Sequence, residues 1–329
     1  MGKAVTVRAF GMPESFALED FDPGPPGPGE VRASIKVAGV SFVDVLATTG
    51  KYQHMPALPY IPGSEGAGLV EAVGEGVTGF APGDRVLFSS SSGGLFAAAN
   101  NFPASRVSRV PQGVSLETAA VIIANYNTAL YALIDRGRVK PGETMLVLGA
   151  AGGTGIAAIQ VGKHLGLRII ASASSEQKRQ AALAAGADAA VETGASDWRD
   201  QVRAANQGRP VDVVFDPVGG SLSELALRTL DYDGRHLVIG FTAGIPAIPT
   251  NLALLKSVSI VGVHLGDTMK RWPEKADGLR AKVLELAEQG VIAPAIAERY
   301  PLHDFAAAMN SAREGKAAGR IVIVNDADQ

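Results

Sequence analysis

The chain of 329 residues contains no cysteine. This absence excludes disulfide bonds, thiol catalysis and every metal site built on thiolate ligands. Aromatic residues are also scarce, at 6%, but 47% of the residues are hydrophobic, which is ample for a packed core and is not typical of a disordered or fibrous chain. The composition therefore predicts a globular protein that carries out its chemistry without sulfur nucleophiles.

Long apolar runs and clusters of one charge are lacking too. No run reaches the roughly 18 to 20 apolar residues that cross a bilayer, and the opening MGKAVTVRAFG alternates like a strand without a signal-peptide core. The net charge is −3 and the basic residues are scattered, unlike the basic stripe of a nucleic-acid-binding surface. We expect a cytoplasmic protein with a small-molecule substrate and neither a membrane nor a nucleic-acid partner.

The sequence pattern changes twice along the chain, which is long enough for two cores. Residues 1–122 hold short β-branched runs between Pro- and Gly-rich turns, typical of a mainly β, barrel-like domain. Residues 123–265 alternate strand and helix patterns, which predicts an α/β doubly wound parallel sheet. We expect residues 266–329, with a helix at Leu279–Gln289, to return to the first domain. The expected strands of the parallel sheet are Thr144–Leu148, Arg168–Ala171, Ala189–Val191, Val211–Phe215, His236–Ile239 and Ser259–Val263.

A glycine-rich loop, GAAGGTG at residues 149–155, follows a strand and opens a helix, which is the context of a dinucleotide fingerprint. Gly152 lets the backbone approach a pyrophosphate, and Gly155 lets the helix pack closely on the strand. The N–H groups and dipole at the helix start favour an anion, although an ordinary glycine-rich turn is the alternative. The loop residues expected to bind the cofactor are Ala151, Gly152, Gly153 and Thr154.

The second strand ends in RIIASASSEQKR, residues 168–179, without an acid at its tip. Hydroxyl groups and cations follow instead, and these suit the 2′-phosphate of NADPH better than the free ribose of NADH. Two alternatives stay open: Ser174 caps the helix with Gln177, or Glu176 turns to the ribose and favours NADH. The hydroxyl and cationic side chains of this segment are Ser172, Ser174, Ser175, Lys178 and Arg179.

Several motifs together resemble the medium-chain dehydrogenase/reductase superfamily over essentially the whole chain. The matching stretches are AGVSFVD (38–44), PGSEGAGLVEAVGEGVTGFAPGDRV (62–86), the glycine loop, FDPVGG (215–220) and GRHLVIGF (234–241). The resemblance implies a Rossmann domain that binds the nucleotide and a discontinuous GroES-like catalytic domain.

Zinc-dependent alcohol dehydrogenases of this superfamily carry a Cys and a His at positions that are Ser41 and Ser64 here. A hydroxyl is a poor zinc ligand, so we expect no metal. Without a Lewis acid, hydride transfer to an electron-poor acceptor is easier than alcohol oxidation. The histidines are dispersed without ligand spacing, and all five are read as surface or packing residues: His54, His164, His236, His264 and His303.

The segment GVSFVDVLATTGKY, residues 39–52, is similar to the pattern GVNxxDxxxRxGxY of zinc-free quinone oxidoreductases related to zeta-crystallin. Asp44 and Tyr52 match that pattern, whereas Ser41 and Thr48 replace its Asn and Arg. The resemblance also implies a homodimer paired through the edge strand near Ser257–Val263. The residues that match the family's cofactor contacts are Thr128, Phe241, Val263 and His264 around the nicotinamide, Lys178 at the 2′-phosphate, and Thr193 in place of a Tyr beside the adenosine ribose.

These patterns predict hydride transfer from NADPH to a quinone held in the cleft between the domains. Tyr52 is the candidate proton donor, and Ser41 and Asp44 would orient it or a water, although Tyr52 could equally be a packing residue. Two other functions stay open. One is NADPH-dependent reduction of α,β-unsaturated carbonyls or enoyl thioesters, and the other is NADPH binding with little turnover.

Overall fold

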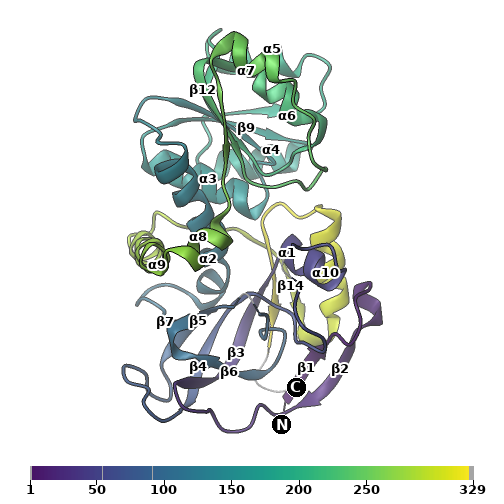
Figure 1. Ribbon diagram of the computed structural model, residues 1–329, viewed down its shortest axis with the longest axis vertical. Helices are drawn as coiled ribbons and strands as arrows, with labels where there is room; N and C mark the ends of the chain where they lie inside the picture. The colour runs from purple at the N-terminus through teal and green to yellow at the C-terminus, as the bar shows by residue number, and fades with distance from the viewer. Residues whose placement is uncertain (1, 54, 91, 326–329) are drawn as a thin grey trace. The chain divides into compact units, whose positions relative to one another are not determined.

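The computed structural model describes residues 2–53, 55–90 and 92–325. The chain divides into two compact units (Figure 1). The first unit comprises Met1–Ala124 and Pro294–Gln329, and the second comprises Asn125–Ala293. The predicted fold class is confirmed, since the second unit is built on a parallel sheet and the first on a separate, mainly antiparallel sheet.

The described residues of the second unit form a six-stranded parallel sheet in the order β10-β9-β8-β11-β12-β13. This order reverses direction next to β8, as in doubly wound nucleotide-binding folds. Every residue of β8 is buried, because a parallel sheet is covered on both faces. The strands are β8 (Thr144–Leu148), β9 (Arg168–Ala173), β10 (Ala189–Glu192), β11 (Val211–Asp216), β12 (Leu230–Val238) and β13 (Ser259–Gly262).

All six predicted strands coincide with observed ones, but β12 begins at Leu230 rather than at the predicted His236. Its first half reads LDYDGR, in which exposed polar residues and an Asp233 with positive φ hide the strand pattern. The helices of this unit are α3 (Gly153–His164), α4 (Glu176–Ala184), α5 (Trp198–Ala205), α6 (Gly220–Leu227), α7 (Thr250–Lys256), α8 (Leu265–Arg271) and α9 (Pro273–Glu288), with a π-helix at Tyr131–Arg136.

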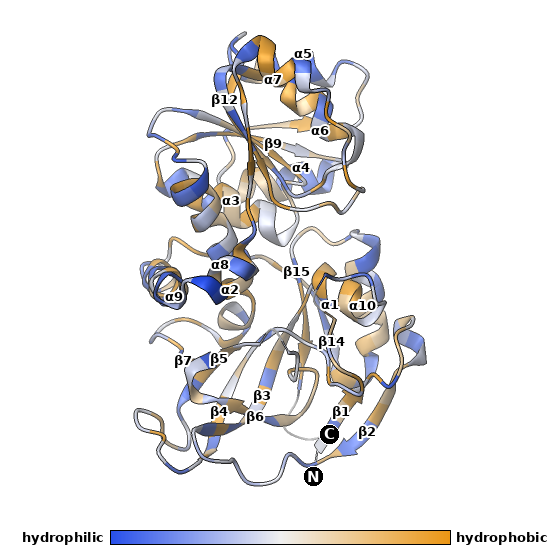
Figure 2. Ribbon diagram, viewed as in Figure 1, coloured by the Kyte–Doolittle hydropathy of each residue, from blue (hydrophilic) through white to orange (hydrophobic). Residues whose placement is uncertain are grey.

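The strands of the parallel sheet carry mostly apolar residues (Figure 2), and these pack with residues of the neighbouring helices in a buried cluster. Leu146, Ile170 and Val214 from three neighbouring strands pack with Trp198 of α5 in one buried cluster. The short helix α7 differs, since its Leu254 and Leu255 are exposed.

The first unit is built on a sheet in the order β14-β15-β3-β4-β5-β7, with β6 paired to β3 and a separate pair β1-β2. Its own core contains Ile35, Phe88, Phe96 and Phe305. The strands are β1 (Gly2–Thr6), β2 (Ala17–Phe21), β3 (Glu30–Val40), β4 (Glu65–Val73), β5 (Arg85–Ser89), β6 (Ala99–Pro103), β7 (Val107–Arg109), β14 (Ile296–Pro301) and β15 (Arg320–Val324). The helices are α1 (Phe42–Thr48), α10 (Phe305–Glu314) and α2 (Leu116–Leu130), whose last residues belong to the second unit.

The return to the first unit occurs at residue 294, later than the predicted 266. Residues 266–293 belong to the second unit because they bond to it: Thr268 donates to Tyr131 at 3.0 Å, and Gln160 donates to the Ala293 carbonyl at 2.9 Å. In the part of the chain that the structure describes, no helix is both long and apolar enough to cross a membrane.

Candidate functional site

The carboxyl ends of the parallel strands bring most of the predicted cofactor residues to one edge of the sheet. Because all six strands run in the same direction, the segments that follow them meet at that edge, where doubly wound folds bind ligands. The glycine loop follows β8 and Thr128 lies on α2. The residues that follow the other strands are Ser174 after β9, Thr193 after β10, Phe241 after β12, and Val263 and His264 after β13.

In the glycine loop, a side chain would have no space at position 155 but would have space at position 152. A Cβ on Gly155 would lie 2.5 Å from the Gly149 oxygen and 2.7 Å from the Ala150 Cα, which confirms the packing role predicted for Gly155. A Cβ on Gly152 would meet only the Gly149 oxygen, at 3.4 Å. No side chain caps α3 at Gly152, and Thr154 is tied by its hydroxyl to Asn125 at 3.0 Å. The backbone around Gly152 is therefore open to a ligand, as an anion-binding helix start requires.

The helix after β9 begins one residue later than the capping alternative assumed. Ser175, rather than Ser174, is its N-cap, and its hydroxyl accepts from the Lys178 N–H at 3.3 Å. The cap predicted at Ser174 is wrong, and Ser174 is exposed. Glu176 accepts hydrogen bonds from Arg179 at 2.8 Å and from Gln180 at 2.7 Å, which lower the pKa of its carboxyl. Its carboxylate is therefore engaged with its own helix.

Two hydroxyls near the strand tips, those of Ser172 and Thr193, are in hydrogen-bond contact. Ser172 is fully buried, accepts from the Trp198 indole at 2.9 Å and lies 2.6 Å from the Thr193 hydroxyl. Ser172 is thus a packing group, which corrects its inclusion among the hydroxyls offered to a phosphate. Thr193 is half-buried just after β10. Its contact with the cofactor ribose stays a prediction.

Asp216, at the end of β11, holds the FDPVGG turn. One of its carboxylate oxygens accepts the N–H groups of Val218 and Gly219, both at 2.9 Å. The other accepts from Ser223 at 2.5 Å and faces the His236 Nε2 at 2.9 Å. Burial raises the pKa of Asp216, but these hydrogen bonds, led by that of His236, outweigh it and hold the pKa below its ordinary value. No local pattern predicts His236 as a partner, because it lies on the neighbouring strand.

In the first unit, Ser41 and Asp44 form the capping box of α1. The Ser41 N–H and hydroxyl both donate to the Asp44 carboxylate, at 2.8 and 2.6 Å, and the Asp44 N–H donates back at 3.3 Å. Ser64 is a second hydroxyl near this carboxylate and, like Ser41, lowers the pKa of Asp44. Burial raises the pKa of Asp44, against the opposing effect of the hydroxyls. Tyr52 lies half-buried in the loop after α1.

This serine-lined position does not fit a zinc ion. Ser41 directs its hydroxyl to Asp44, and Ser64 lies near the same carboxylate. The next carboxylate, Glu65, is buried, accepts from the Ala124 N–H at 3.2 Å and pairs with Arg320, so its charge is already balanced. Hydroxyl oxygens and two carboxylates that are already engaged lack the donor set that zinc prefers.

The histidine side chains do not supply zinc ligands at this position either. His236 is buried against Asp216, and His164, His264 and His303 are exposed, while His54 lies outside the described residues. Within residues 2–53, 55–90 and 92–325, no three His, Asp or Glu side chains gather as a metal site would need.

Comparison with known proteins gives matches over both units. A model of the alcohol dehydrogenase GroES-like domain matches residues 27–112, and a model of zinc-binding dehydrogenases matches residues 153–280. The quinone oxidoreductase-like protein 2 of Bos taurus is 35% identical over 311 residues, which cover 94% of this chain and 88% of the relative.

The chain is also similar to solved structures over nearly its whole length. A probable oxidoreductase from Mycobacterium abscessus aligns with a TM-score of 0.88 at 33% identity, covering 98% of this chain and 99% of the other. A quinone oxidoreductase of Escherichia coli, complexed with NADPH, aligns with a TM-score of 0.88 at 28% identity over 98% of this chain and 99% of the other.

Proposed function

The chain belongs to the medium-chain dehydrogenase/reductase superfamily, among the relatives of quinone oxidoreductases, and from that premise we propose that it is an NADPH-dependent quinone reductase that works without a metal ion. In this reaction, NADPH, one proton and a quinone give NADP⁺ and a hydroquinone. The observation that carries the proposal is the pair of hydroxyls, Ser41 bonded to Asp44 and Ser64 near it, where zinc enzymes of the superfamily carry Cys and His.

The residues at the carboxyl ends of the parallel strands support the assignment of NADPH as the cofactor. Gly152 leaves the backbone accessible at the start of α3, and the helix dipole there favours the pyrophosphate. The NADPH complex of the E. coli relative supports the same cofactor. Ala151, Gly153 and Thr154 would complete the cradle, and Thr128, Phe241, Val263 and His264 would line the nicotinamide side. Bound there, NADPH supplies the hydride.

Selectivity for the phosphorylated nucleotide rests on the segment after β9. Glu176 is engaged with Arg179 and Gln180, which argues against its binding a ribose hydroxyl as NADH-specific enzymes require. Ser174 is exposed at the strand tip and Lys178 lies in the first turn of α4. We therefore assign the 2′-phosphate to these two side chains, with Thr193 beside the ribose.

The proposed proton donor is the Tyr52 hydroxyl. Asp44 accepts hydrogen bonds from the N–H and the hydroxyl of Ser41, so it acts as an anchor that fixes Ser41 at the start of α1. Ser41 in turn would position Tyr52 or a water at the reduced oxygen. A quinone becomes a stable hydroquinone anion on accepting hydride, and that anion also takes its proton readily from water.

A panel of acceptors tests this function. NADPH oxidation is followed with a quinone, an enone and an enoyl thioester, for wild type, Tyr52→Phe and the control Tyr300→Phe, whose residue lies on β14. We expect the highest kcat/KM with the quinone. If Tyr52 delivers the proton in the transition state, Tyr52→Phe lowers kcat by about 10²- to 10⁴-fold. Faster reduction of the enone or thioester contradicts the quinone assignment, and unchanged turnover in Tyr52→Phe removes the donor role.

A further inference from the structure

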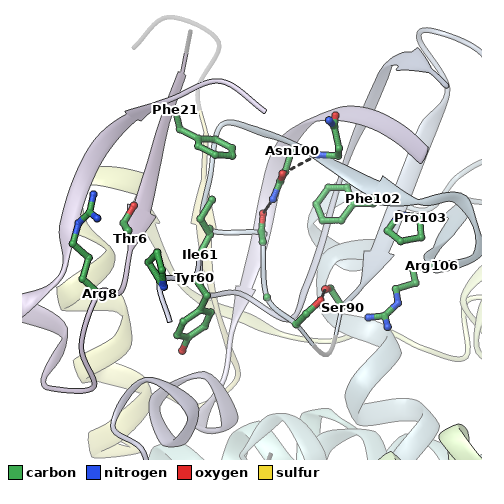
Figure 3. A pocket seen from close by; sticks show the side chains of 15 residues that line it. Thr6, Arg8, Phe21, Tyr60, Ile61, Ser90, Asn100, Phe102, Pro103 and Arg106 are labelled. Carbon is green, nitrogen blue, oxygen red and sulfur yellow. Dashed lines mark hydrogen bonds between the residues drawn. The ribbon is translucent and has the colours of Figure 1, made fainter. Parts of the chain in front are cut away.

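A pocket of about 560 Å³ in the first unit, shown in Figure 3, mixes apolar, polar and charged side chains in its lining. Arg8 on this lining is already paired with Glu19 at 3.0 Å. Tyr52 and Asp44, both among the residues that the structure describes, do not line it. The pocket therefore points to no ligand. A buried polar cluster in the second unit, by contrast, connects to one of the predicted cofactor residues.

Asp216, Ser223 and His236 form this polar cluster at the carboxyl end of β11. Each is exposed by 2% or less. The Asp216 carboxyl accepts from the Ser223 hydroxyl at 2.5 Å and faces the His236 Nε2 at 2.9 Å. A carboxylate can only accept a hydrogen bond, so the His236 Nε2 carries the proton that joins the two residues.

The cluster holds the turn that follows β11. The second carboxylate oxygen of Asp216 accepts the N–H groups of Val218 and Gly219, both at 2.9 Å. Gly219 and Gly220 both have a positive φ, of 74° and 60°, so the turn follows a backbone path that glycine adopts readily and other residues rarely do. Side-chain and backbone donors thus converge on one buried carboxylate, which fixes the turn from inside the protein.

The turn in turn supports the loop after β12, residues 241–244. The Ala243 N–H donates to the Val218 carbonyl at 2.7 Å. A Cβ on Gly219 would lie 3.2 Å from the Phe241 Cα, so the turn and the loop are in direct contact. Phe241 is 42% exposed, which leaves its ring accessible to a ligand. The position of Phe241 therefore depends on the turn that Asp216 holds.

The glycine loop after β8 depends less on this turn. It meets the turn through a side chain, since a Cβ on Gly149 would lie 2.9 Å from the Val218 Cγ2. The Gly152 N–H donates to the Gly149 carbonyl at 3.0 Å, a bond within the loop itself. We therefore expect the cluster to affect the nicotinamide side of the cofactor site and not the phosphate side.

His236 keeps one nitrogen unpaired inside the protein. Its Nδ1 is buried and has no hydrogen-bond partner among the described residues. An unpaired buried polar atom destabilises the folded state, and an apolar side chain would fill this site without that loss. Packing alone does not account for an imidazole here, whereas the hydrogen bond from Nε2 to Asp216 does.

We propose that Asp216, Ser223 and His236 are positioning residues that hold Phe241 in the orientation which hydride transfer from the nicotinamide requires. They act through the turn rather than by contact with the cofactor. The inference rests on the proposed function, which assigns Phe241 to the nicotinamide side, and deepens it by naming what fixes Phe241. Hydride transfer is sensitive to such positioning, because a displacement of about 1 Å can lower a rate by about 100-fold.

Two substitutions of His236 separate its hydrogen bond from its packing. His236→Gln keeps an N–H donor near the position of Nε2, and His236→Met fills the site with an apolar side chain that cannot donate. The matched control is Thr144→Val, which removes the buried hydrogen bond from Thr144 to Asn206, of 3.1 Å, at the amino end of β8. A merely structural role predicts a lower Tm in His236→Met and in Thr144→Val, with unchanged kcat in both folded variants.

The positioning role predicts a different result. With a quinone, well below the Tm of each variant, we expect kcat of His236→Met to fall by about 10- to 100-fold, with a smaller change in KM. His236→Gln should recover most of that kcat, and Thr144→Val should keep the wild-type kcat.

Two binding measurements test the same role without turnover. The fluorescence of NADPH comes from its nicotinamide, so its change on binding should differ from that of the wild type in His236→Met and not in Thr144→Val. The Kd for 2′,5′-ADP, which carries the 2′-phosphate but no nicotinamide, should be the same in all these variants. If His236→Met does not fold, Ser223→Ala takes its place, with a smaller effect in the same direction.

Unchanged kcat and unchanged NADPH fluorescence in His236→Met, or in Ser223→Ala where it takes its place, overturn this inference and leave the proposed function standing. A loss that His236→Gln or Thr144→Val shares in full also overturns it. A wild type that binds NADPH but reduces no quinone overturns the proposed function itself, while the fluorescence comparison still tests the cluster.

Discussion

At the residue scale, local pairs were predictable and distant pairs were not. Ser41 and Asp44 are three residues apart, and their spacing is that of a capping box, so the sequence alone brings them together. Asp216 and His236 meet because β11 and β12 are neighbours, which no local pattern encodes. Tyr60 lies in the turn-like stretch PYIPG, where nothing in the spacing predicts that its hydroxyl is buried without a hydrogen-bond partner among the described residues.

Replacement of Lys178 tests the proposed selectivity for NADPH over NADH. Lys178→Ala should raise the Kd for NADPH by about 10- to 100-fold, since a charge-assisted hydrogen bond contributes about 1.5–3 kcal/mol. The Kd for NADH should stay the same, because NADH has no 2′-phosphate. Fluorescence titration with both nucleotides measures this.

The matched control is Lys282→Ala, since Lys282 pairs with Glu285 on α9 at 2.9 Å. It should bind both nucleotides like the wild type. An equal loss of both nucleotides in Lys178→Ala would contradict a phosphate contact.

At the scale of elements, the strand–loop–helix unit of β8 and α3 was predicted closely, because its apolar run, its glycines and its helical period lie in one continuous stretch. The cap of α4 was predicted one residue early, at Ser174 instead of Ser175. Either serine can cap a helix, and only the backbone path decides between them. The start of β12 was missed because its exposed first half lacks apolar alternation.

Replacement of Gly152 or Gly155 with alanine tests the different roles that we propose for these two glycines. Gly155→Ala forces a methyl group against the Gly149 and Ala150 backbone and should lower the free energy of unfolding by about 1–3 kcal/mol. Gly152→Ala, where the φ of −75° suits alanine, should fold as stably as the wild type and yet bind NADPH more weakly. Chemical denaturation and nucleotide titration of both variants measure the two effects. Weaker folding of Gly152→Ala with normal NADPH binding would contradict the cradle.

At the scale of the whole molecule, the alternation of strands and helices was enough to predict the parallel sheet, but not the point at which the chain leaves it. Helices α8 and α9 carry no strand signal, so the sequence did not assign them to the second unit. The bond of Thr268 to Tyr131 and that of Gln160 to Ala293 fix them there, and each joins residues more than a hundred positions apart.

We also propose that the protein forms a homodimer through the edge strand β13. β13 forms one edge of the parallel sheet, and its Ile260 is 43% exposed. An exposed apolar edge strand is a ready pairing surface. We expect a dimer by light scattering, and a monomer for Ile260→Lys. Leu225→Lys, which alters an equally exposed apolar residue of α6, should stay dimeric. A monomeric wild type would contradict edge pairing.

We propose that this protein passes hydride from NADPH to a quinone without a metal ion. The most direct measurement is the rate of NADPH oxidation with a quinone by protein that has been treated with a chelator and whose zinc content has been determined in the same sample. We expect full turnover at negligible zinc and no gain when zinc is added. Turnover that disappears with the metal and returns only with stoichiometric zinc would contradict it.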